Sequence, residues 1–128
     1  LNGSFGQAPG SDSEGAARLA TISGDAFDST SPFAGESYDA AALILLAMQA
    51  ASSTNPADYK GKVFDVANAP GEQILPGELG KALDILASGG EIDYVGASNV
   101  ELIGAGESAG NYREIEIKGA KISTVGYR

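Results

Sequence analysis

The apolar pattern is strongest over positions 40–51, where a run of Ala, Leu, Ile and Met is interrupted only by Gln49. Because these residue types favour helix, the run predicts a helix over about 37–51. A helix that is apolar almost all round is typical of a buried element. Its twelve apolar-run residues would span about 18 Å, too short to cross a bilayer. We therefore expect a helix buried on all sides within a globular domain.

Three shorter helices are predicted, around 14–20, from Pro56 onward and over about 78–88. Ala and Leu favour the first, although Gly15 disfavours it. The second begins where Asn55 can act as N-cap and Pro56 as first helical residue. It should turn four apolar side chains toward a partner: Val63, Phe64, Val66 and Ala67. The third repeats apolar residues at i, i+3, i+4 and i+7 before a left-handed stop at a glycine pair: Leu79, Ala82, Leu83, Leu86, then Gly89 and Gly90.

Strand patterns gather near the C-terminal end. Residues 112–117 alternate between two faces, and the turn at 118–121 leads into a second strand over 122–127, which together predict a hairpin. A further strand is expected around 100–103, whereas 73–77 is interpreted as an extended link and 93–98 as loop or edge. These strands are too few to cover the buried helix, so we expect the missing ones upstream. The first residue, Leu1 rather than Met, agrees with a chain that is a piece of a longer protein.

Composition restricts the possible functions. The chain has 128 residues, 43% of them hydrophobic, which is typical of one globular domain. Its net charge of −9 and lack of a Lys/Arg cluster disfavour nucleic acid as a partner. The absence of Cys and His excludes disulfides, thiol nucleophiles and His-based triads within these residues. We therefore expect no enzyme activity, no cofactor and no direct membrane insertion.

Local motifs give little support to nucleotide binding, nucleophilic catalysis or calcium binding. The glycine-rich segment 104–110 is followed by a strand pattern rather than the helix that a dinucleotide fingerprint requires. Ser37 stands in a partial nucleophile elbow, but the closing glycine and an activating His are missing. Loop acids lack the spacing of a calcium loop and are interpreted as solvated: Asp12, Glu14, Asp25 and Asp28. Glu36 and Asp39, near the start of the predicted buried helix, are expected to complement its dipole.

An ordered set of short stretches resembles the C-terminal third of type I periplasmic solute-binding proteins, the leucine/isoleucine/valine-binding, extracellular ligand-binding receptor family. The matching stretches are Gly6–Gly10, Ser31–Phe33, Tyr38–Ala41, Pro76–Glu78, Gly90–Ser98 and Gly110–Ile117. One departure is that residues 102–107, Leu-Ile-Gly-Ala-Gly-Glu, stand where members commonly carry a Phe-Asp-x-x-Gly-Asp turn.

The resemblance implies an α/β protein with two Rossmann-like, three-layer lobes joined by crossing strands. Residues 1–128 would be its C-terminal third, with segments in both lobes. It further implies a periplasmic, extracytoplasmic component of an ABC transporter that binds an amino acid or similar small polar solute between the lobes and is read by a membrane permease. A ligand-sensing module of the same fold is an alternative, and a complete small enzyme is a third.

Two residues are implied as ligand contacts. Phe33 matches an aromatic position that contacts the ligand side chain in branched-chain members, and Tyr38 follows at the start of the helix. A loop aromatic such as Phe33 can equally be a packing residue, and the Tyr38 ring can pack while its hydroxyl finds one partner. The family's main anchors for the ligand's ammonium and carboxylate groups would lie upstream of this chain.

Overall fold

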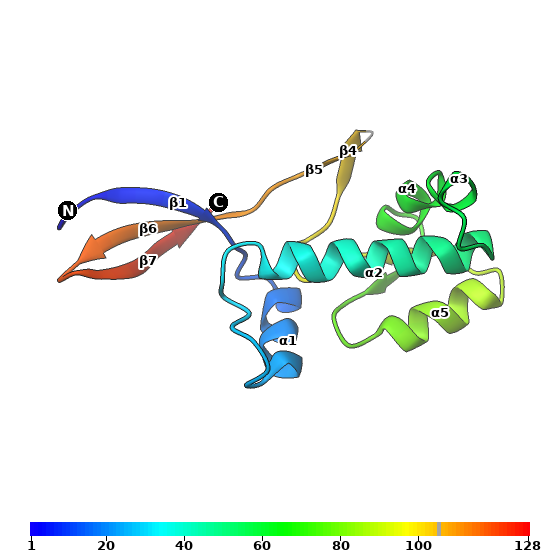
Figure 1. The fold of residues 1–128 in the computed structure, drawn as a ribbon, viewed down its shortest axis with the longest axis horizontal. Coiled ribbons are helices and arrows are strands. Elements are labelled where there is room, and N and C mark those ends of the chain that lie inside the picture. The colour runs from blue at the N-terminus through cyan, green and yellow to red at the C-terminus, as the bar shows by residue number, and fades with distance from the viewer. Residues whose placement is uncertain (105) are drawn as a thin grey trace.

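The structure, a computed structural model, describes residues 1–104 and 106–128. Helices and small sheets are mixed along the chain, which confirms the predicted mixed α/β class (Figure 1). The two-lobe arrangement stays a prediction. The elements are β1 (Phe5–Pro9), α1 (Glu14–Ser23), α2 (Ala34–Ala51), α3 (Pro56–Tyr59), α4 (Lys62–Ala67), β2 (Glu72–Ile74), α5 (Leu79–Ala87), β3 (Ile92–Tyr94), β4 (Leu102–Gly104), β5 (Glu107–Ser108), β6 (Tyr112–Lys118) and β7 (Lys121–Tyr127).

The hydrophobic core lies between α2, α4, α5 and the β2–β3 pair. On α2 one face is buried at helical spacing: Asp39, Ala42, Leu43, Leu46 and Ala47. The other core side chains come from the short elements that pack on this face: Val66, Ala67, Ile74, Ala82, Ile92, Tyr94 and Val100. The core thus depends on one long helix and several short elements around it.

Within the described residues, α2 is buried on one face only, and the predicted cover of its other face by upstream strands stays a prediction. Ile44 is 44% exposed and Leu45 54% exposed, because the elements described here cover only the opposite face of the helix. The helix also begins at Ala34, three residues before the predicted start at Ser37. Among the described residues, no helix combines the length and the apolar character needed to span a membrane.

The segment after α2 forms two short helices rather than the single one predicted. Asn55 caps α3 as predicted, because its side-chain oxygen accepts a hydrogen bond from Ala57 N at 3.1 Å. The expectation for Val66 and Ala67 is confirmed, since both are buried, whereas Phe64 is 49% exposed. The predicted third helix corresponds to α5, and Gly89 follows it with φ 81°.

Residues expected to be links or loops form a parallel pair of strands, β2 and β3. Their register places Glu72 opposite Ile92 and Ile74 opposite Tyr94. Ile74, Ile92 and Tyr94 are all fully buried. Each strand has only three residues, too few for a two-residue alternation to be recognised in the sequence.

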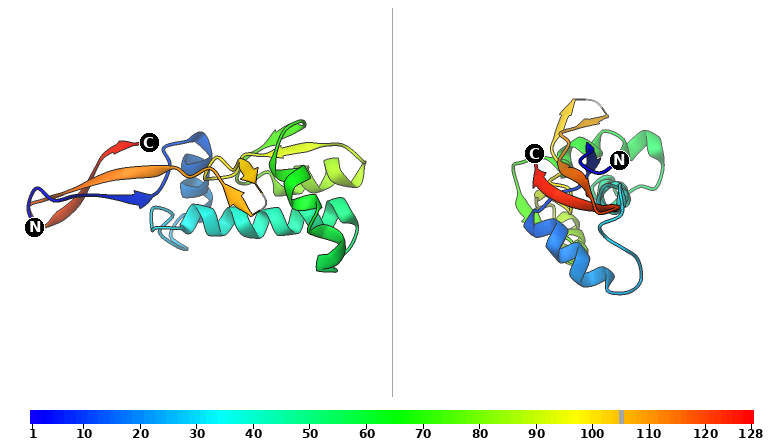
Figure 2. Two further views of the ribbon diagram at one scale, coloured as in Figure 1. Left: turned by 90° about the horizontal axis from the view of Figure 1, so that it is seen from above. Right: turned by 90° about the vertical axis from the view of Figure 1, so that its left-hand side faces the viewer.

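A separate antiparallel sheet, in the order β1-β6-β7, extends from one end of the helices (Figures 1 and 2). The predicted hairpin is confirmed: Lys118 pairs with Lys121, and Gly119 and Ala120 both have positive φ, as a two-residue type I′ turn requires. β1, in a segment without clear periodicity, was not predicted. The strand expected at 100–103 corresponds to β4, and position 105, within the segment that departs from the family pattern, lies outside the described residues.

Candidate functional site

The loop Tyr94–Ser98 organises the region where the helices meet the sheet. Asp39, which is 2% exposed, projects from α2 into this loop. One carboxylate oxygen accepts from the Tyr94 hydroxyl at 2.9 Å and from Ala97 N at 2.8 Å. The other accepts from Ser98 N at 2.8 Å and from the Ser98 hydroxyl at 2.6 Å. Four donors therefore compensate a buried negative charge, which would otherwise be costly.

The predicted dipole role of Asp39 is therefore replaced by a different one. Since α2 begins at Ala34, Asp39 lies beyond the first turn, whereas Glu36 lies within it. Burial in the first place, and the neighbouring Asp39 carboxylate in the second, raise the pKa of Tyr94. The phenol therefore keeps its proton and remains a donor to Asp39.

Two glycines allow α1 to approach this loop. A Cβ on Gly15 would overlap the Gly96 carbonyl oxygen and lie 2.9 Å from the Gly96 carbonyl carbon. Gly96 itself has φ +62°, and a Cβ there would lie 2.6 Å from Tyr94 Cε1. Both positions thus require glycine, one for close backbone approach and one for its left-handed conformation as well.

The two chain segments that join the helices to the sheet are both fastened to this loop. Ser13 caps α1 by accepting from Ala16 N at 3.1 Å, and its hydroxyl donates to Ala97 O at 3.1 Å. Asn111 Nδ2, just before β6, donates to Ser98 O at 2.7 Å. The two segments are also bonded to each other, because Gly10 N donates to Asn111 O at 3.2 Å. We conclude that one loop fixes the sheet relative to both helix starts.

A cavity of about 290 Å³ lies beside this loop, between the starts of α1 and α2 and the sheet. Its charged lining residues are Asp12, Glu36 and Arg113, and hydroxyls come from several serines and a threonine. The complete lining is Pro9–Ser13, Ala16, Ala17, Leu19, Ala20, Ser29–Ser31, Gly35, Glu36, Ala97, Ser98, Arg113 and Tyr127. A small polar molecule fits such a space, with apolar α1 side chains on one part of the wall and polar groups on the rest.

Phe33 lies at the edge of this cavity without lining it. Its neighbours in sequence, Ser31 and Gly35, are lining residues, while the Phe33 side chain is 61% exposed. Phe33 precedes the first residue of α2 and has φ 66°, a left-handed conformation that is rare for a bulky residue. The loop thus presents the aromatic ring to solvent next to the cavity.

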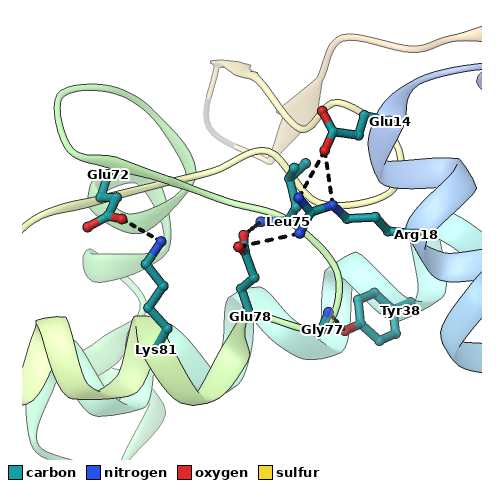
Figure 3. A network of polar contacts seen from close by, with 8 residues as sticks. All are labelled: Glu14, Arg18, Tyr38, Glu72, Leu75, Gly77, Glu78 and Lys81. Carbon is teal, nitrogen blue, oxygen red and sulfur yellow. Dashed lines mark hydrogen bonds and ion pairs between the residues drawn. The ribbon is translucent and has the colours of Figure 1, made fainter.

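Tyr38 is partly buried and points toward the start of α5, away from the lining set. Its hydroxyl accepts a hydrogen bond of 3.4 Å from Gly77 N (Figure 3). The structure therefore places Tyr38 and Phe33 on the same helix start but does not bring their side chains together in the cavity. For Tyr38, the expectation that its hydroxyl has one partner is confirmed.

A polar network next to Tyr38 joins α1 to the start of α5 (Figure 3). Arg18 contacts Glu14 at 2.9 Å and Glu78 at 3.4 Å. Glu78 also accepts from Leu75 N at 2.9 Å. This hydrogen bond, followed by attraction from Arg18, lowers the pKa of Glu78. Arg18 therefore donates to two carboxylates of its own chain.

The sequence patterns did not single out Arg113 or the 94–98 loop as parts of a site. Arg113 shares one face of a predicted strand with Ile115 and Ile117, and only the fold reveals that it lines a cavity with residues far away in sequence. Within residues 1–104 and 106–128, no group of three or more acidic side chains is arranged to hold a metal ion.

Comparison with known proteins shows similarity to a substrate-binding protein. That relative is the chemotactic signal transduction system substrate-binding protein BasB of Halobacterium salinarum. The two are 35% identical over 94 residues, which are 73% of this chain and 23% of BasB, so the chain spans about a quarter of the length of this relative. No protein-family model matches the chain, and no solved structure matches it. The chain thus shares partial similarity with a binding protein rather than with an enzyme.

Proposed function

We propose that the chain is the C-terminal part of an extracytoplasmic solute-binding protein of an ABC transporter. The solute would be an amino acid or a similar small polar molecule, bound in a cleft between two lobes and delivered to a membrane permease. The observation that carries the proposal is the 35% identity to a substrate-binding protein over 94 residues. The mechanism needs no reactive side chain, because the ligand only stabilises the closed arrangement over the open one.

The joint around the 94–98 loop supports this function. A two-lobed receptor needs a defined connection between the lobes, and here Ser13 and Asn111 hold both connecting segments against one loop. We propose that the cavity beside this joint is the share of the solute cleft that this chain contributes. Phe33, at the edge of this cavity, is a proposed ligand contact, and its left-handed backbone agrees, since strained residues cluster at ligand sites. Tyr38 is also a proposed contact, on the family resemblance alone, because its hydroxyl accepts from Gly77 N outside the cavity lining.

A sensing function is the second candidate, because BasB is named as a component of chemotactic signal transduction. The same closing motion would then be read by a signalling partner instead of a permease. A permease gene beside the parent gene would favour transport, and a transducer gene would favour sensing.

We expect the full-length protein that contains this chain to carry a small solute when it is purified without denaturation. Native mass spectrometry should show a chain several times heavier than 12.9 kDa with a non-covalent adduct that is lost on denaturation. The adduct mass would identify the solute. An intact gene product of 12.9 kDa that carries no adduct would contradict the proposed function.

Phe33→Ala should weaken binding of solutes with apolar side chains by about 1–3 kcal/mol, the usual range for an aromatic side chain that becomes buried against its ligand. Calorimetric titration of the full-length protein with L-leucine and L-isoleucine measures this loss. Phe64→Ala is the matched control, because Phe64 is also a partly exposed phenylalanine but lies on α4, no residue of which lines this cavity. Equal affinities for both variants and the unchanged protein would exclude Phe33 as a contact.

A further inference from the structure

Arg113 is distinguished from the other two arginines by its hydrogen bonding. Arg18 forms ion pairs with Glu14 and Glu78, and Arg128 with Glu114. Arg113 forms no such pair among the described residues, and its Nε is buried without a hydrogen-bond acceptor. Its aliphatic part packs over Gly10, where a Cβ would lie 3.4 Å from Arg113 Cδ.

A buried guanidinium donor without an acceptor is costly, more so than a neutral one. A protein group would lower this cost by supplying an acceptor. Asp28 attracts Arg113 but lies beyond ion-pair distance, and its carboxylate accepts instead from the Thr30 N–H at 2.9 Å and the Thr30 hydroxyl at 2.7 Å. Because Arg113 lines the cavity, a ligand placed there could supply the missing acceptor.

The surroundings of Arg113 add further donors. The starts of α1 and α2 face the same cavity, and helix N-termini carry partial positive charge. Ser11, Ser29 and Ser31 also line it and carry hydroxyls. A planar guanidinium matches the two oxygens of a carboxylate, which it can bind through two parallel hydrogen bonds.

We propose that Arg113 forms a carboxylate-binding subsite in this cavity, so that the molecule bound there carries a carboxylate group. The inference rests on the proposed function in one respect, namely that the cavity is the site of the solute. It assigns to this chain an anchor that the family resemblance places upstream. Asp12 and Glu36 also line the cavity and oppose any excess negative charge, so the subsite holds one carboxylate and not a polyanion.

The test uses the resonance of the Arg113 Nε–H group in the ¹⁵N-labelled full-length protein, assigned through bonds to the backbone. Sodium acetate is the probe, and sodium chloride at the same ionic strength and acetamide are the controls. Acetate should move this resonance in a saturable way, while the resonances of Arg18 and Arg128 stay in place. Chloride and acetamide should not reproduce the shift.

Two variants make the assignment specific. Arg113→Gln should weaken the acetate response of the Ser11 and Ser98 backbone amides at least tenfold. Arg128→Gln is the matched control, because this side chain is 74% exposed and paired with Glu114, and it should leave that response unchanged.

An unmoved Arg113 resonance, or an equal shift with chloride, would overturn the inference. A carboxylate from another part of the full-length protein that already accepts from Nε–H would do the same. A solute found by native mass spectrometry together with no acetate response would leave the proposed function intact and reject the subsite alone. An acetate response without any bound solute would support the subsite and count against the proposed function.

Discussion

Asp39→Asn should destabilise the folded protein by about 2–4 kcal/mol, because the carboxylate accepts four hydrogen bonds and an amide oxygen replaces only half of it. The amide NH₂ must face either Ala97 N–H or Ser98 N–H, and a backbone donor cannot turn away. Hydroxyls of Tyr94 and Ser98 can rotate and accept. Removal of a buried charge offsets part of the loss, but four donors already compensate that charge.

The first unfolding transition of the full-length protein in urea measures this effect. Asp84→Asn is the matched control, since Asp84 is an exposed aspartate on α5, and it should change stability by no more than about 0.5 kcal/mol. Tyr94→Phe removes only one of the four donors and should cause a smaller loss than Asp39→Asn. A variant Asp39→Asn as stable as Asp84→Asn would show that the loop is held by other contacts.

The elements that could be predicted from the sequence are those whose signal lies within the element itself. Asn55 before Pro56 marks a helix start by local capping, and Gly119 marks a two-residue hairpin turn. β2 and β3 were not predicted as strands, because three residues give no alternation and their pairing joins segments some twenty residues apart. The exposed Ile44 and Leu45 show the converse case. Their apolar pattern predicts burial, but the elements described here leave both side chains partly exposed.

The candidate site was less predictable than the fold. Phe33 and Tyr38 came from the family resemblance, and their ligand contacts stay predictions. The cavity depends on Arg113, on the loop around Ser98 and on the start of α1, which only tertiary structure brings together. A contact between segments far apart in the sequence leaves no periodic pattern in either segment. The one local signal was Gly15, a helix-disfavouring residue in a predicted helix, whose physical reason is now the approach of Gly96.

Gly15→Ala should cause a large loss of stability, about 3 kcal/mol or more, because the new methyl group would occupy the place of the Gly96 carbonyl oxygen. The clash involves backbone on both sides, with Ala97 Cα at 3.1 Å, so no side chain can rotate away to relieve it. To accept the methyl group, α1 would have to move off the loop. This movement would break the bond from the Ser13 hydroxyl to Ala97 O and loosen one of the two connections to the sheet.

Gly80→Ala provides a matched control for this prediction. Gly80 is the second residue of α5, as Gly15 is of α1, but a Cβ at Gly80 meets nothing within 4 Å. Since alanine favours helix over glycine, Gly80→Ala should raise stability by about 0.5–1 kcal/mol. Thermal unfolding followed by circular dichroism should therefore give shifts of opposite sign for the two variants. Shifts of the same sign would mean that α1 does not lie against the Gly96 carbonyl, and they would contradict the described lining of the cavity beside α1.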